Sequence, residues 1–228
     1  MEDDTVSRNP TLFDQTATDF TAKVDKFIDS GRYRRGNLFL AAAASSVPSH
    51  GTILDYGCGP GRISTLLAGR GFRVLGVDPS SAMIAAARQQ RLDSHQVEFQ
   101  LCESRPLDGQ REAFDAIVCS SVIEYELHPV ELLRRFFATL RPSGVLIISF
   151  ANSRSLSRAL FQRRNLHLGA QVHTWSLPQF TEILEQGGFR PTREAVYFES
   201  FFDRIAPLRF LSASQFAGAL GLIVAAKR

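Results

Sequence analysis

The sequence is poor in cysteine, and the three that it has, Cys58, Cys102 and Cys119, stand far apart. No Cys-x-x-Cys pair occurs and the count is odd, so neither a structural zinc site nor a disulfide framework is predicted. Free cysteine behaves as a small apolar side chain and is usually buried. We therefore expect three reduced thiols in the core, and no metal site.

A long hydrophobic run is missing as well, since no stretch approaches the roughly 20 apolar residues that a membrane-spanning helix needs. The first ten residues, MEDDTVSRNP, lack the basic start and the apolar stretch of a secretion signal. These absences predict a cytoplasmic protein. Charge of one sign is not in excess either: the net charge of +3 is too small to indicate nucleic-acid binding unless it is concentrated.

What the sequence does have is a regular alternation of strand-like and helix-like segments. Apolar and β-branched runs predict strands at 52–56, 73–77, 96–101, 114–119 and 144–150, followed by two more at 193–200 and 219–228. Helical patterns are found at 62–69, 80–91, 129–140 and 177–186. The predicted class is α/β: a seven-stranded, mostly parallel sheet with helices on both faces and an antiparallel C-terminal hairpin at its edge.

The strongest motif is Asp55-Tyr-Gly-Cys-Gly-Pro-Gly61, which ends the first predicted strand and opens a helix. Its glycines let the backbone turn sharply and approach a ligand closely, and the helix start behind them offers N–H donors. Alone, such a turn is a weak sign of a nucleotide-like site. Asp78 strengthens it, because a carboxylate at the end of the second strand can accept hydrogen bonds from both ribose hydroxyls of an adenosine.

Two alternatives bear on this motif. Asp78 could instead cap the helix at 80–91, although Ser80 or Ser81 could provide that cap. The ligand could be a dinucleotide, but the dinucleotide pattern G-x-G-x-x-G requires glycine where Arg62 stands. That departure counts against NAD.

The string LDYGCGPG resembles the L-D-x-G-C-G-x-G motif of class I S-adenosylmethionine-dependent methyltransferases. VDPSSAMIAAAR, VEFQLCESRPL, FDAIVCSSVIEY and LRPSGVLIIS are similar, in order, to that family's second- to fifth-strand motifs, so the resemblance covers about residues 50–150. It implies a Rossmann-like fold, S-adenosyl-L-methionine as cofactor and methyl transfer to a small organic molecule, with oxygen as the favoured acceptor atom. N-methylation of a small amine or sugar, and a non-catalytic S-adenosylmethionine-binding partner subunit, are the alternatives.

Carried over residue by residue, the resemblance implies cofactor contacts along the whole motif region. Asp55, Gly57, Cys58, Gly59 and Gly61 would line the methionine half; Asp78 would bind the ribose, Pro79 and Met83 would pack on the adenine, Glu103 would lie near it with Cys102 and Ser104, and Ser120 would lie near the sulfonium. Plain helix packing explains Pro79 and Met83 equally well. In GRYRRG, Tyr33 with Arg34 or Arg35 could reach the cofactor carboxylate or form a solvated face.

A general base would help to remove a proton from a hydroxyl, phenol or amine acceptor. Candidates are Glu124 and Tyr125, after the fourth strand, and His173, before the helix at 177–186. The family's turn often reads L-E-H, but Tyr125 stands at the histidine position here. His173 could equally be a surface or structural histidine.

The remaining segments suggest a division into an N-terminal helical cap (1–50), an S-adenosylmethionine-binding core (51–150), and a lid helix with the substrate side (151–228). The part 149–186 is loosely similar to ubiquinone-pathway O-methyltransferases, without their metal-binding glutamates. The basic, amphipathic segment 153–169 could meet a membrane surface, cover a hydrophobic substrate, or be a helix with one solvated face. No N-P-P-Y-type tetrad follows the fourth strand, so nucleic acid is not an expected partner.

Overall fold

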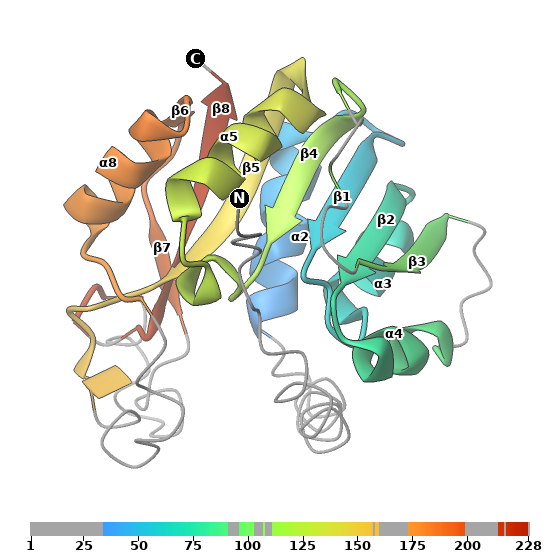
Figure 1. Ribbon diagram of the computed structural model, residues 1–228, viewed down its shortest axis with the longest axis horizontal. Helices are drawn as coiled ribbons and strands as arrows, with labels where there is room; N and C mark the ends of the chain where they lie inside the picture. The colour runs from blue at the N-terminus through green and yellow to red at the C-terminus, as the bar shows by residue number, and fades with distance from the viewer. Residues whose placement is uncertain are drawn as a thin grey trace, which may run out of the picture.

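The computed structural model describes residues 34–90, 96–102, 107, 111–156, 158–159, 173–198, 214–216 and 218–227. A central sheet carries helices on both sides (Figure 1). Its strands are Thr52–Tyr56 (β1), Arg73–Asp78 (β2), Val97–Leu101 (β3), Phe114–Cys119 (β4), Leu140–Ala151 (β5), Phe189–Pro191 (β6), Val196–Phe198 (β7) and Leu220–Lys227 (β8). The helices are Arg34–Ser46 (α2), Arg62–Ala68 (α3), Ser81–Arg88 (α4), Pro129–Thr139 (α5) and Leu177–Gln186 (α8), with a 3₁₀ turn at Ile123–Tyr125 (η1).

The strand order is β3-β2-β1-β4-β5-β8-β6, with β7 also paired to β8. β1 to β5 are parallel, and β8 runs antiparallel between β5 and the edge. This confirms the predicted α/β class and the antiparallel C-terminal part. The parallel strands all end at the lower edge of the sheet in Figure 1, which places their loops together.

The sheet has eight strands rather than seven because two short strands share the edge position beside β8. β6 pairs with the last residues of β8 and β7 with its first residues. The predicted strand at 193–200 therefore has the wrong bounds. Pro191 has no N–H to donate, and the chain leaves the ladder after it, with Thr192 still bonded to the Val224 carbonyl.

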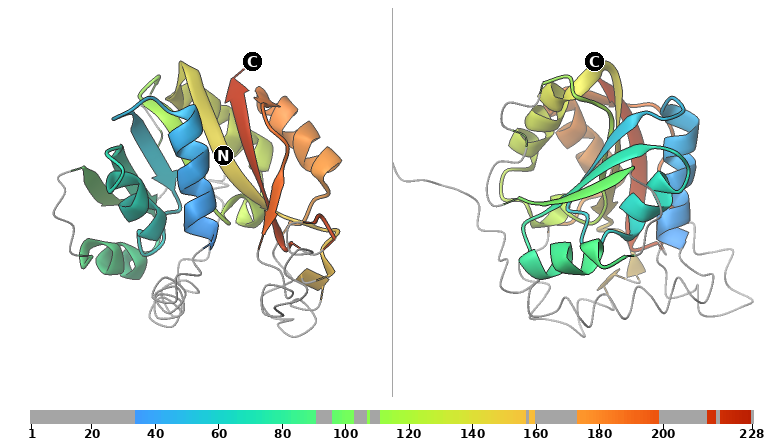
Figure 2. Two further views of the ribbon diagram at one scale, coloured as in Figure 1. Left: turned by 180° about the vertical axis from the view of Figure 1, so that it is seen from behind. Right: turned by 90° about the vertical axis from the view of Figure 1, so that its right-hand side faces the viewer.

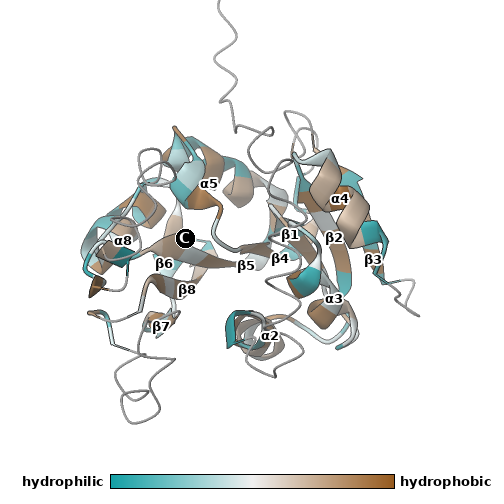
Figure 3. Ribbon diagram, turned by 90° about the horizontal axis from the view of Figure 1, so that it is seen from below, coloured by the Kyte–Doolittle hydropathy of each residue, from teal (hydrophilic) through white to brown (hydrophobic). Residues whose placement is uncertain are grey.

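Helices cover the sheet on both faces (Figure 2). On one face, α2 and α3 bury Phe39, Ala43 and Leu67 against β1, β4 and β8; on the other, α5 and α8 bury Leu133, Phe136 and Phe180. Viewed from the edge where the parallel strands end, the two helical layers lie on opposite sides of the sheet (Figure 3). A strand covered on both faces is mostly apolar, and β4 reads Phe-Asp-Ala-Ile-Val-Cys, in which only Asp115 near its start is charged.

The described part of the predicted N-terminal cap is α2, which packs against α3 and β5 on the sheet face. Residues 1–33 and 160–172 lie outside the described residues, so the cap and lid assignments stay predictions. All three cysteines are buried and free, as expected. Within the described ranges, no helix has the length and apolarity needed to span a membrane.

Candidate functional site

The glycine loop follows β1 and closes over the end of β2. The N–H groups of Gly57 and Cys58 both donate to the carbonyl of Val77, at 2.8 and 3.0 Å. Gly57, Gly59 and Gly61 have φ angles of 74°, 54° and 77°, in the left-handed region where a Cβ is strained. The loop conformation therefore depends on glycine at each of these positions.

The three glycines differ in what surrounds them. A Cβ on Gly57 would stand 2.3 Å from Val122 Cγ2, and one on Gly61 would stand 2.5 Å from the ring of Phe99. A Cβ on Gly59 would meet no heavy atom within 4 Å. Gly57 and Gly61 thus serve internal packing, whereas Gly59 faces open space, where a ligand could approach the backbone.

Asp78, at the end of β2, lies beside Gly59. One of its carboxylate oxygens accepts the N–H of Gly59 and the other accepts the N–H of Ser80, each at 2.9 Å. Ser80 itself caps α4, because its hydroxyl accepts the N–H of Met83. The helix-cap alternative for Asp78 is therefore wrong, and its carboxylate instead fixes the glycine loop. Each oxygen of an ionised carboxylate can accept more than one hydrogen bond, so this arrangement is compatible with ribose binding.

Asp55 lies beneath the loop rather than at its open side. It is 1% exposed and accepts a 2.6 Å hydrogen bond from the hydroxyl of Ser64 on α3. Burial raises the pKa of Asp55 to about 7; the negative charge of Asp78 also raises it, and the hydrogen bond from Ser64 opposes the rise. Asp55 therefore joins β1 to α3 within the core.

The other predicted cofactor residues lie along the same edge. Cys58 is buried, and its pKa is raised well above the usual value by burial and by the charges of Asp55 and Asp78, which keeps the thiol neutral. Met83 is buried in the first turn of α4 and Pro79 is half-buried before it. Arg34 is exposed at the start of α2, while Tyr33 and Glu103 lie outside the described residues.

The turn after β4 contributes two serines to the site. The hydroxyl oxygens of Ser120 and Ser121 are buried and have no hydrogen-bond partner within the described part of the chain. Ser121 has a φ of 54°, and its N–H donates to the hydroxyl of Ser149 on β5 at 2.9 Å. Buried hydroxyls without a protein partner, on a strained turn, are consistent with contact to a polar ligand.

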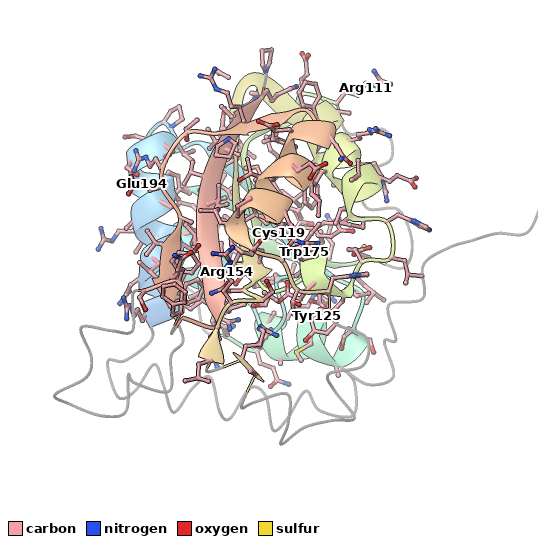
Figure 4. The ribbon with its side chains drawn as sticks, turned by 90° about the vertical axis from the view of Figure 1, so that its left-hand side faces the viewer. Arg111, Cys119, Tyr125, Arg154, Trp175 and Glu194 are labelled. Atoms are coloured by element: carbon pink, nitrogen blue, oxygen red, sulfur yellow. The ribbon has the colours of Figure 1, made fainter. Side chains whose placement is uncertain are left out.

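The structure brings the three predicted catalytic residues together. The N–H of His173 donates to the carbonyl of Glu124 at 2.7 Å, which joins the segment before α8 to η1. Glu124 is 2% exposed, whereas the ring of His173 is exposed and lies nearly parallel to that of Trp175. Burial raises the pKa of Tyr125, and the charge of Glu124 raises it further. Figure 4 shows Tyr125 and Trp175 on the lower half of the molecule, away from Arg111.

Sequence reasoning missed the residues that support this site from neighbouring elements. Ser64 and Ser149 hold Asp55 and the Ser121 turn, and Gln90 contacts the Pro60 carbonyl and the Thr65 hydroxyl from the end of α4. A serine inside an otherwise apolar helix face or strand, such as Ser64 beside Ile63 and Leu67, is the signal that could have indicated the first two.

Comparison with known proteins relates the chain to methyltransferases. A family model described as a methyltransferase domain matches residues 28–194. The chain is 35% identical over 108 residues to a ubiquinone biosynthesis O-methyltransferase of Bradyrhizobium diazoefficiens (47% of this chain, 43% of the relative). It is 33% identical over 138 residues to a trans-aconitate 2-methyltransferase of Paracidovorax citrulli (60% of this chain, 52% of the relative). The matches thus span about half the length of these curated relatives.

Among solved structures, the chain resembles the magnesium protoporphyrin IX methyltransferase of Synechocystis PCC 6803 with bound SAH. The TM-score is 0.70 at 19% identity, over 96% of this chain and 98% of the other, a likeness that concerns the fold. Because the family model covers well over half of the sequence, the chain belongs to the methyltransferase domain family.

Proposed function

We propose that this chain transfers a methyl group from S-adenosylmethionine to an oxygen atom of a small organic acceptor. The observation that carries the proposal is the glycine loop, where Gly59 faces open space and its N–H is held by the carboxylate of Asp78. The family membership supports it, as do the relatives named as O-methyltransferases and the similar structure with bound SAH.

The residues present fit this cofactor. Asp78 would hold the ribose, since its carboxylate lies beside Gly59 and each of its oxygens can accept a further hydrogen bond, and Gly59 would let the backbone approach the ligand. Pro79 and Met83 would lie against the adenine, and Ser120 near the sulfonium. When bound, the cofactor supplies an electrophilic methyl group.

The protein's main task in such a displacement is to hold the acceptor in line with the methyl group. Glu124 is the proposed proton acceptor, because its carboxylate is buried next to the turn that carries Ser120. Tyr125, whose raised pKa keeps it protonated at neutral pH, would donate a hydrogen bond to the acceptor rather than remove its proton. His173, held beside Glu124 through its backbone, is the alternative base.

A radiolabelled methyl-transfer assay over phenols, hydroxy acids, amines and sugars tests the proposal. We expect labelled product from oxygen acceptors, with kcat lowered about 100-fold or more in Glu124→Gln because a general base is lost. Glu131→Gln, an exposed position on α5, is the matched control and should keep full activity.

Three other results would count against the proposal. Label on nitrogen alone would make the chain an N-methyltransferase. Tight binding of S-adenosylhomocysteine without transfer to any compound would favour a non-catalytic partner subunit. Unchanged kcat in Glu124→Gln would remove that residue from the reaction.

A further inference from the structure

Arg158 lies just beyond the end of β5 and is held in a defined position. Its backbone N–H donates to the hydroxyl of Ser155, and its Nε donates to the carbonyl of Ala219, each at 3.2 Å. The side chain is half-buried. No carboxylate within the described ranges forms an ion pair with it, whereas Arg141 pairs with Asp115 at 2.6 Å at the opposite end of the sheet.

Arg158 belongs to the same edge of the sheet as the proposed catalytic residues. The Ala219 carbonyl that it binds also accepts the N–H of Asn152, the first residue after β5. The N–H of Trp175 donates to the carbonyl of Ala151, the last residue of β5. Two residues earlier, the N–H of His173 donates to the carbonyl of Glu124. Figure 4 shows Arg154, four residues before Arg158, on the same side of the molecule as Tyr125 and Trp175.

The charge of Arg158 acts on the acceptor side of the site. Burial raises the pKa of Tyr125, and the positive charges of Arg158 and Arg35 oppose that rise. Arg35 comes from the first turn of α2 and Arg158 from the segment after β5, so two cations from separate parts of the chain act on the same hydroxyl.

Arg158 keeps its positive charge, and an anion bound to it would offset the cost of removing its guanidinium from water. The guanidinium has five N–H donors in a planar fork, and the Nε bond to Ala219 uses one of them. The remaining donors match the paired oxygens of a carboxylate or phosphate.

Building on the methyl-transfer function proposed above, we propose that the acceptor is a small organic anion whose carboxylate or phosphate group binds Arg158. The anion would fix the far end of the acceptor, leaving its reacting oxygen beside Glu124. Neutral molecules of the same shape would then be poor acceptors.

The test uses sets of three matched compounds with labelled S-adenosylmethionine. The members of a set differ in one group, which is a carboxylic acid, a phosphate monoester or a neutral primary amide. We expect turnover of the acid or the phosphate, and which of the two is preferred identifies the anion. The kcat/KM of the amide should be lower by about 10-fold or more. Arg158→Gln should raise KM for the preferred anion about 10-fold or more, and Arg158→Lys should recover part of that loss.

Arg111→Gln is the matched control, because Arg111 is an exposed arginine far from Tyr125 (Figure 4). Equal turnover of amide and acid would overturn the inference, as would an unchanged KM in Arg158→Gln. Failure of every acid and phosphate, while S-adenosylhomocysteine still binds, would reject the anionic acceptor and leave the cofactor assignment intact. Failure to bind S-adenosylhomocysteine would reject the proposed function and this inference with it.

Discussion

Two acidic residues at the ends of neighbouring strands have different roles in the glycine loop. Asp78 accepts the N–H of Gly59 in the loop and the N–H of Ser80 at the start of α4, so it joins the loop to that helix. Asp55 is enclosed beneath the loop, with the Ser64 hydroxyl as its partner. Because Asp55 has lost nearly all contact with water, its ionisation is opposed by burial and by the neighbouring charge of Asp78.

This burial predicts a pH-dependent stability that Asp55→Asn removes. The pKa of Asp55 is about 7 in the folded chain, whereas its ordinary value, which applies to the unfolded chain, is 3.8. The folded state therefore binds the proton more strongly than the unfolded state does. The contribution of Asp55 is therefore present at low pH and is lost as pH rises from about 4 to 7. Relative to Asp55→Asn, the wild type should lose ~2–3 kcal/mol of unfolding free energy between pH 5 and pH 7.5.

Urea unfolding of both proteins at the two pH values measures this difference, since the other titrating groups are common to both. A wild-type to variant difference that stays constant with pH would show that Asp55 ionises normally in the folded state.

At the scale of the elements, the glycines of the loop between β1 and α3 differ in what they contact. Gly61 lies against the Phe99 ring of β3 and Gly57 against Val122, while Gly59 faces open space. The three positions share a left-handed backbone, so alanine costs about 1–2 kcal/mol of backbone strain at any of them. Only the surroundings differ.

The pair Gly61→Ala and Gly59→Ala tests this difference. Gly61→Ala should lose roughly 2–4 kcal/mol of unfolding free energy, because overpacking against Phe99 adds to the strain. Gly59→Ala should lose only about 1–2 kcal/mol, yet should weaken S-adenosylhomocysteine binding, since its methyl group would occupy the open space beside the loop. Urea unfolding and calorimetry on both variants provide the comparison. Full affinity in Gly59→Ala would place the ligand elsewhere.

The elements that the sequence predicted well are those whose signals are local. β1 and β4 have the predicted bounds because each is an apolar run of strand length between turn residues. α8 also matches, from its start at Leu177 to its end before the Gly187-Gly188 pair. The glycine loop and Asp78 were predictable for the same reason, since their residues are read from short motifs.

Features that depend on distant partners were not predictable. β5 begins at Leu140 rather than at residue 144, because Leu140 pairs with Phe114 across a register shift. The edge of the sheet is divided between two three-residue strands, each defined only by its pairing with β8. The bond from Ser121 to Ser149 joins residues 28 positions apart and requires the β4–β5 register to be known.

On the scale of the whole molecule, the parallel strands bring the functional segments to one edge. The glycine loop follows β1, Asp78 ends β2, the Ser120 turn and η1 follow β4, and Arg158 comes after β5. β8 runs in the opposite direction, so its N-terminal end joins the same edge and supplies the Ala219 carbonyl. The proposed cofactor residues and the proposed acceptor residues thus lie along the same edge of the sheet.

Calorimetric titration with S-adenosylhomocysteine, with NAD and ATP as comparison ligands, tests this arrangement most directly. We predict one S-adenosylhomocysteine site and no comparable NAD binding. In folded Asp78→Ala, the affinity for S-adenosylhomocysteine should fall by about 10-fold or more, because charged hydrogen bonds of ~1.5–3 kcal/mol are lost. Unchanged affinity in that variant, or preferential binding of NAD, would contradict a cleft built for a nucleoside with an amino-acid tail.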